Sequence, residues 1–206
     1  MTDRLSLKNF NALAVPLPEK RIWARLGYNR SSLTPAAQTR KIRDWINAAF
    51  LLCEPRGRAV VLPLIRCDAD VVELAGGVVF HSAKLADNLR GSAQVAIMAA
   101  TIGEALPRAA SAKIAAGDGA AALVYDAVGT ETVEAALDHI DEYCARAYRS
   151  AGRGRPRFSP GYGDWSLSAQ AQFAEILSLS ALGVTVTDRL QLLPEKSVTA
   201  VKGLVA

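Results

Sequence analysis

The strand-like segments in the first half of this 206-residue chain constrain its fold more than any other feature. Apolar runs at residues 58–65, 71–74 and 78–81 are separated by short turns, and Gly76-Gly77 lies between the last two. That spacing is typical of a β-hairpin. The continuous apolar run at 93–101 is typical of a fully buried strand. Strands that follow one another without regular alternation with helices favour an α+β fold with a mainly antiparallel sheet.

The other periodic segments are expected to be helices and closing strands. Thr34 and Ser82 have the side chains that accept hydrogen bonds from the first free N–H groups of a helix, and Pro35 suits a first helical position. Helices are predicted over residues 18–27, from 35 to about 53, 83–89, from 104 to about 117, from 119 to about 149 and, capped by Ser166 and ended by Gly183, over 167–179. The core face of the longest should carry Val133, Leu137, Ile140, Cys144 and Tyr148. Strands near 184–193 and 198–204 should close the chain.

Length and composition indicate one globular domain, or at most two small ones, and we expect a single domain over residues 1–206. The predicted elements divide it into a helical N-terminal region over about 1–55 and a core over about 56–206. The three cysteines form no C-x-x-C pair, and their odd number argues against a disulfide framework. We therefore expect a cytoplasmic protein. No 18-residue run is free of charge, so no membrane segment is expected. A net charge of +4 does not by itself indicate a nucleic-acid partner.

The most informative segment is the loop at residues 157–165, with the sequence RFSPGYGDW. Pro160 fixes its own φ angle, whereas Gly161 and Gly163 permit positive φ and a close approach of a ligand to the backbone. Tyr162 supplies a flat apolar face with a polar tip. Arg157 can hold a carboxylate through two parallel hydrogen bonds. On residue types alone, this loop suits a zwitterionic ligand that carries a purine, or else is a rigid surface loop with a buried aromatic anchor.

The pattern Arg-x-x-x-Gly-Tyr at 157–162 resembles the S-adenosylmethionine-binding motif of the activation domain of cobalamin-dependent methionine synthase. The longer form, Arg-Phe-Ser-Pro-Gly-Tyr-Gly-Asp, is similar to the version in short, free-standing members of that family. Residues 193–203 resemble the closing strand of the family, and residues 99–103 resemble its strand-to-helix turn. The resemblance covers about residues 93–206 and implies the α+β fold of the activation domain.

The resemblance also implies a function. The family supplies S-adenosylmethionine when the cobalt of a corrinoid cofactor has been oxidised to the inactive Co(II) state, and one electron plus the methyl group restore methylcobalamin. The implied partners are a corrinoid-binding protein or methyltransferase that carries the cobalamin and an electron donor such as a flavodoxin or ferredoxin. This role belongs to methionine biosynthesis and favours a methyltransferase component, with no nucleic acid or membrane expected. Whether methyl transfer takes place on this chain unaided is left open.

The same resemblance assigns the site residues. Arg157 would hold the methionine carboxylate, and Tyr162 would shape the pocket. The backbone around the bend would meet the adenine side of the ligand, through Ser159, Pro160, Gly161 and Gly163. Glu134 aligns with an acidic helix residue of the family site, where it would pair with the ammonium or sulfonium charge; alternatively, it belongs to a solvated helix face with Asp138 and Asp141. No catalytic residue and no metal ligand is assigned.

The sequence departs from the family pattern in two places. Full-length members have a proline after Gly-Tyr and then a histidine-containing stretch that faces the cobalamin, whereas this chain continues with Gly163-Asp164-Trp165. The acidic residue just before the family arginine is replaced by a run rich in glycine and arginine. Binding of the methyl donor could therefore be kept while corrinoid docking differs.

Two other functions remain open from the sequence. Residues 153–156 spell Arg-Gly-Arg-Pro, the core of an AT-hook that lays arginines into the minor groove of A·T-rich DNA. Alternatively, the chain is a non-catalytic scaffold or chaperone for a corrinoid protein that has lost ligand binding.

Overall fold

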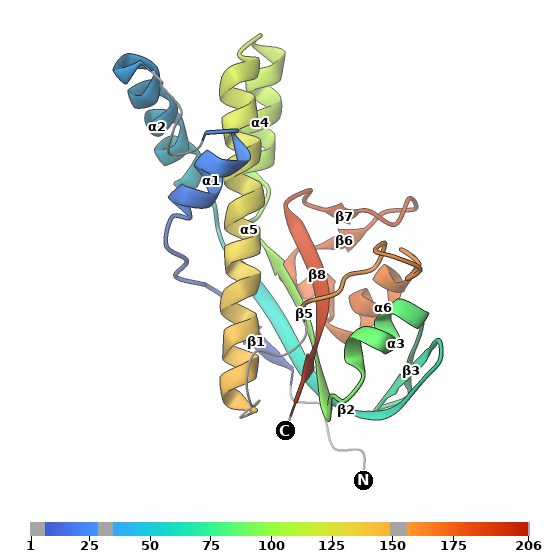
Figure 1. The fold of residues 1–206 in the computed structure, drawn as a ribbon. Helices are drawn as coiled ribbons and strands as arrows, with labels where there is room; N and C mark the ends of the chain where they lie inside the picture. Colours follow the sequence, from blue (N-terminus) through green and yellow to red (C-terminus); the bar gives the residue numbers. More distant parts are fainter. Residues whose placement is uncertain (1–6, 29–34, 149–155, 206) are drawn as a thin grey trace.

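The computed structural model describes residues 7–28, 35–148 and 156–205. Its centre is an antiparallel sheet in the order β4-β3-β2-β5-β8, with β1 paired to β2 at the side (Figure 1). The strands of this sheet are β1 (Lys8–Phe10), β2 (Arg56–Asp68), β3 (Val71–Leu74), β4 (Val78–His81), β5 (Gln94–Thr101) and β8 (Ser197–Leu204). A second, two-stranded sheet pairs β6 (Thr185–Val186) with β7 (Leu192–Leu193). The predicted α+β class with an antiparallel sheet is confirmed.

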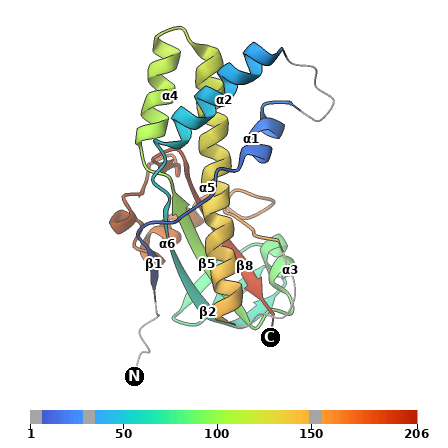
Figure 2. The ribbon, with the colours of Figure 1, turned by 90° about the vertical axis from the view of Figure 1, so that its left-hand side faces the viewer.

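Helices cover both faces of the central sheet. These helices are α1 (Glu19–Arg25), α2 (Ala36–Phe50), α3 (Ala83–Leu89), α4 (Ala105–Ala115), α5 (Gly119–Ala147), α6 (Ala169–Ile176) and the 3₁₀ helix η1 (Leu179–Leu182). The long helix α5 lies along one face and extends beyond the sheet, where α2 and α4 pack against it (Figure 2). Helices α3 and α6 lie on the opposite face (Figure 1).

The sheet therefore separates two apolar cores. Strand β5 is buried almost throughout, and its side chains alternate between them, as the period of two in a strand requires. Ala96, Met98 and Ala100 join the core under α5. Val95, Ile97 and Ala99 join the core under α3 and α6. This explains why the sequence of β5 is a continuous apolar run.

Locally encoded features form as expected. Strands β3 and β4 pair directly across Gly76 and Gly77, both of which have positive φ. The Ser82 hydroxyl caps α3 by accepting a hydrogen bond from Leu85 N at 2.9 Å. Val133, Leu137, Ile140 and Cys144 are buried on α5.

Helix ends were predicted less well. Thr34, the expected cap of α2, lies outside the described residues; Pro35 is the N-cap residue with an extended ψ of 139°, and the helix ends at Phe50. Tyr148 is exposed beyond the last turn of α5, so its assignment to the core face was wrong. Ser166 does not cap α6, because the Ser166 hydroxyl hydrogen-bonds to Ser168 in a turn before the helix.

Two further segments differ from the prediction. After α6 ends, η1 continues to the left-handed Gly183, and the segment expected as one strand at 184–193 forms two short strands, β6 and β7, joined by a turn. Strand β1 lies within the N-terminal region that was expected to be helical. None of the described helices is both long enough and apolar enough to cross a membrane.

Candidate functional site

The loop at residues 157–165 is fixed at both ends against the sheet. Phe158 forms an antiparallel bridge with Val201 of β8, and each donates a backbone N–H to the other, at 2.9 and 2.8 Å. At the other end, Trp165 is only 3% exposed. Its ring packs against Phe80, Phe158 and Phe173 at centroid distances of 5.1, 6.1 and 5.8 Å. The loop is therefore an extension of the sheet edge with a buried aromatic anchor.

Asp164 gives the loop a polar anchor next to this aromatic one. Its carboxylate accepts hydrogen bonds from the Ser82 hydroxyl at 2.5 Å, from Ala83 N at 2.8 Å and from Lys84 N at 3.2 Å. The two backbone donors, Ala83 and Lys84, are free N–H groups at the start of α3, where a negative charge is favoured. The Ser82 hydrogen bond above all holds the pKa of Asp164 below its ordinary value.

The tip of the loop requires glycine in two places. Gly161 and Gly163 have φ of +92° and +61°, a region that favours glycine. A Cβ atom on Gly163 would also lie 2.5 Å from Lys84 Cδ. Between the two glycines, the Tyr162 side chain is 67% exposed. The bend therefore presents an aromatic ring on a rigid backbone.

A cavity of about 250 Å³ lies between this loop, α5 and β8. Its walls are Glu134 and Leu137 of α5, Val198 and Ala200 of β8, and Arg157, Phe158, Ser159 and Tyr162 of the loop. Four of the seven residues predicted for the site therefore line one cavity: Glu134, Arg157, Ser159 and Tyr162. Pro160, Gly161 and Gly163 do not line it; Pro160 is buried, and the two glycines shape the bend.

The charge of the cavity comes from an arginine held between two carboxylates. Arg157 Nη2 donates a hydrogen bond to Glu134 Oε2 at 2.9 Å, and Arg157 Nη1 lies 2.8 Å from Asp138 Oδ1. The second contact is an ion pair without the alignment of a hydrogen bond. The Arg157 side chain is 19% exposed, whereas Glu134 and Asp138 are 34% and 43% exposed. The guanidinium is thus paired with protein acids but remains at the wall of the cavity.

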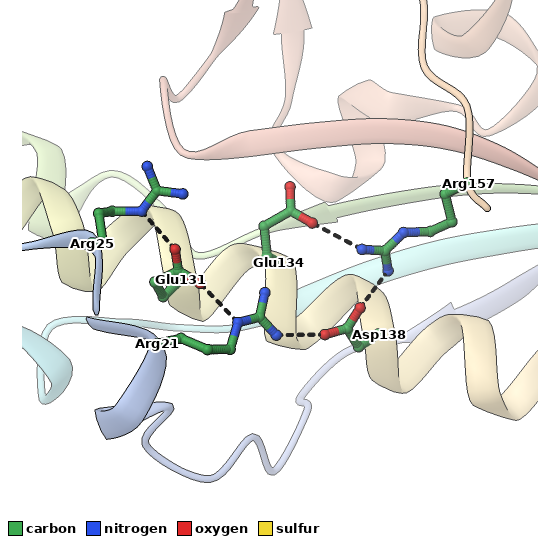
Figure 3. A network of polar contacts seen from close by, with 6 residues as sticks. All are labelled: Arg21, Arg25, Glu131, Glu134, Asp138 and Arg157. Atoms are coloured by element: carbon green, nitrogen blue, oxygen red, sulfur yellow. Dashed lines mark hydrogen bonds and ion pairs between the residues drawn. The ribbon is translucent and has the colours of Figure 1, made fainter. Parts of the chain in front are cut away.

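The pair at the cavity is one end of a longer network along α5 (Figure 3). Arg21 of α1 donates to Asp138 Oδ2 at 2.6 Å and to Glu131 Oε2 at 2.8 Å. Arg25 donates to the second oxygen of Glu131 at 2.5 Å. Burial alone would raise the pKa of Glu131, whose side chain is 8% exposed, but the hydrogen bonds from Arg25 and Arg21 outweigh burial and lower it. Acids and arginines thus alternate from α1 to the loop.

Sequence reasoning missed the role of Asp138 and Asp164. Asp138 was considered only as part of a solvated helix face, yet it lies one turn from Glu134, on the same side of α5. That i, i+4 spacing of two acids was the available signal. Asp164 belongs to the motif itself, but its partners are about 80 residues away at the start of α3, which no local pattern reveals.

Other features of the molecule give no stronger candidate. Two larger cavities, of about 340 and 330 Å³, lie at the helical end and are lined mostly by apolar side chains of α4, α5 and α2. Burial raises the pKa of Cys53 to about 11 and that of Cys144 to about 12, so neither thiol is a nucleophile at neutral pH. Within the described ranges no group of three or more His, Cys, Asp or Glu side chains could hold a metal ion. Most of the AT-hook-like segment lies outside the described residues.

Comparison with known proteins shows where this architecture has been seen. No family model matches the chain, and no curated protein matches it. A solved structure does: the crystal structure of the MetH reactivation domain bound to AdoHcy (S-adenosylhomocysteine). It is 17% identical, with a TM-score of 0.74 over 98% of this chain and 79% of that chain. The chain has the fold of the MetH reactivation domain.

The MetH reactivation domain is the structure that the motif at 157–162 implied, so the expected fold is confirmed. The likeness also extends further than the sequence indicated. The sequence resemblance began at about residue 93, whereas the shared fold includes nearly the whole chain and therefore β1, α1 and α2.

Proposed function

We propose that this chain binds S-adenosylmethionine in the cavity between α5 and the loop, and that it supports reductive methylation of a corrinoid cofactor on a partner protein. The observation that carries the proposal is that Arg157 of the loop and Glu134 of α5 meet at one cavity, beside the bend of the motif. The MetH reactivation domain, whose fold this chain shares, was crystallised with the demethylated form of the same ligand.

The charges at the cavity suit the amino-acid end of the ligand. A free amino acid has a carboxylate and an ammonium group on one carbon, so its complement is a cation next to an anion. Arg157 and Glu134 are such a pair, with 2.9 Å between Arg157 Nη2 and Glu134 Oε2. The ligand carboxylate would bind the guanidinium, and its ammonium would bind Glu134, so the ligand replaces the internal ion pair without leaving either charge alone.

The size of the cavity supports a proposal for how the two ends of the ligand would lie. Pockets that enclose a drug-sized ligand usually measure roughly 300–1,000 Å³, and this cavity is smaller. It would therefore enclose the amino-acid end, while the purine lies on the exposed ring of Tyr162. The N–H groups of Gly161 and Tyr162 already donate within the loop, to Trp165 O and Ser159 O. Backbone contacts to the purine would come from carbonyl oxygens, which accept from its amino group.

The residues of the site would position the ligand, and little acid–base chemistry is needed because the sulfonium is already an activated leaving group. Bound S-adenosylmethionine would supply an activated methyl group to cobalt on a corrinoid-binding protein or methyltransferase, with one electron from a donor such as a flavodoxin or ferredoxin. Arg157, Glu134 and Tyr162 would fix the direction in which the methyl group points. The three free cysteines support a reducing compartment, and we propose the cytoplasm.

Two experiments test this function. S-Adenosylmethionine and S-adenosylhomocysteine should raise the melting temperature, because a ligand that binds the native state stabilises it. Absence of any shift at millimolar ligand would remove the ligand assignment. In a reactivation assay, a cob(II)alamin-loaded partner, a reductant and S-adenosylmethionine should give methylcobalamin faster with this protein than without it; equal rates would contradict the corrinoid role.

A further inference from the structure

The structure connects the N-terminal helix to the candidate ligand arginine through one shared carboxylate (Figure 3). Asp138 Oδ2 accepts a hydrogen bond from Arg21 of α1 at 2.6 Å, and Asp138 Oδ1 lies 2.8 Å from Arg157 Nη1. The Arg21 contact is an aligned hydrogen bond, whereas the Arg157 contact is not aligned. Asp138 does not line the cavity, so its influence on a ligand must pass through Arg157.

Arg21, whose side chain is 44% exposed, has further contacts that position it to compete for that carboxylate. Its Nε atom is fixed by Glu131, and its helix is fixed by Ile22, which is fully buried in the core under α5. Arg25 pairs with the other oxygen of Glu131 and, among the described residues, forms no hydrogen bond or ion pair with Asp138. Of the two arginines on α1, Arg21 alone therefore reaches the group that neutralises Arg157.

We infer that Arg21 is a positioning residue that holds Asp138 away from full pairing with Arg157 and so keeps the guanidinium available for a ligand carboxylate. This inference rests on the proposed function. Without Arg21, both oxygens of Asp138 would turn to Arg157, and the ligand carboxylate would have to displace a stronger internal partner. Conversely, a carboxylate on Arg157 releases Asp138 to Arg21, so ligand binding tightens the contact between α1 and α5.

The test is a double-mutant cycle on ligand affinity, measured by calorimetry with S-adenosylhomocysteine. Arg21→Met should weaken binding about 1.5- to fivefold, the fold-change that corresponds to a partly exposed ion pair. Arg21→Lys should recover most of this loss. In an Asp138→Asn background, Arg21→Met should have no further effect, because the two residues act through one contact.

A matched variant separates this role from simple destabilisation. Arg25→Met also removes one hydrogen bond from α1 to Glu131, yet it should leave ligand affinity unchanged. A second probe, 5′-methylthioadenosine, lacks the amino-acid end, so its binding should not respond to Arg21→Met.

The outcomes distinguish the inference from the function on which it rests. If the unmodified protein binds no S-adenosylhomocysteine, the proposed function fails. If it binds but Arg21→Met has no effect, or has the same effect in the Asp138→Asn background or on 5′-methylthioadenosine, the function stands and the positioning role of Arg21 is wrong.

Discussion

Both faces of the central sheet bury an apolar core, but the loop at residues 157–165 is anchored differently on each face. On the face of α3 and α6, Trp165 lies in an aromatic cluster and Asp164 caps a helix. On the face of α5, Arg157 is paired with half-exposed acids. The apolar anchor gives the loop a fixed shape, because close packing leaves few alternative positions.

The charged anchor has a different consequence. Ion pairs between partly exposed groups contribute little stability, and a ligand of suitable charge can replace them. Stability and recognition should therefore depend on different anchors of the loop. The aromatic anchor should determine whether the loop is folded, and the charged anchor should determine which ligand it binds. The variants below test this separation.

The largest expected effect is on stability, at the aromatic anchor. Trp165→Ala should lower the free energy of unfolding by about 3–5 kcal/mol, because it removes a large buried ring and leaves a cavity. Tyr162→Ala, at the exposed tip of the same loop, should change it by no more than about 0.5 kcal/mol. Denaturant unfolding of both variants measures the difference, and equal losses would contradict the separation.

The next effect is on binding, at the charged anchor. Arg157→Ala should weaken S-adenosylhomocysteine binding by about 1.5–3 kcal/mol, the usual value of a charge-assisted hydrogen bond. Arg157→Lys should recover only part of this, since lysine cannot form two parallel hydrogen bonds. The control in calorimetry is Arg108→Ala, because Arg108 forms an exposed ion pair with Glu104 at the start of α4. Unchanged affinity in Arg157→Ala would remove this residue from the site.

A smaller effect is expected within the charged network. Glu131→Gln should destabilise the protein by about 1–2 kcal/mol, because two arginines lose a buried acceptor but can turn to solvent. Glu142 forms an exposed i, i+4 ion pair with Arg146 on the same helix, so Glu142→Gln should lower the free energy of unfolding by less than about 0.5 kcal/mol. Thermal unfolding distinguishes the two, and a cost at Glu131 no larger than at Glu142 would show that the network is not structural.

The smallest effect is the dependence of stability on pH at Asp164. Because hydrogen bonds lower its pKa in the folded state, its contribution is fully present above the ordinary aspartate range and is lost as the pH falls through the lowered value. The difference in melting temperature between the unmodified protein and Asp164→Asn should therefore shrink from pH 7 toward pH 3. A difference that stays constant with pH would mean that the charge of Asp164 does not stabilise the cap.

The sequence predicted those parts of the fold whose interactions are local. The hairpin at Gly76-Gly77, the Ser82 cap and the buried run of β5 each depend on neighbouring residues. Residues 184–193 were predicted as one strand but form the short strands β6 and β7 around a turn, because the apolar pattern of a short segment does not reveal which partner it pairs with. Strand β1 was missed for the same reason, since its pairing partner in β2 is about 50 residues away.

The motif residues of the candidate site could be predicted from the sequence, but the residues that pair with them in the fold could not. Arg157, Tyr162 and the two glycines have residue types that indicate a binding loop. The pairing of Arg157 with Asp138, and of Asp138 with Arg21, joins residues 19 and 117 positions apart. Such contacts depend on how α1 and α5 pack, which neither periodicity nor motif specifies.

The most direct test of the central claim is a crystal structure of this protein with S-adenosylhomocysteine. We predict that the ligand carboxylate lies on Arg157, its ammonium on Glu134 and its purine beside Tyr162, with Asp138 paired to Arg21. Ligand bound instead in one of the two larger cavities at the helical end, with the Arg157–Glu134 pair intact, would contradict the proposed site.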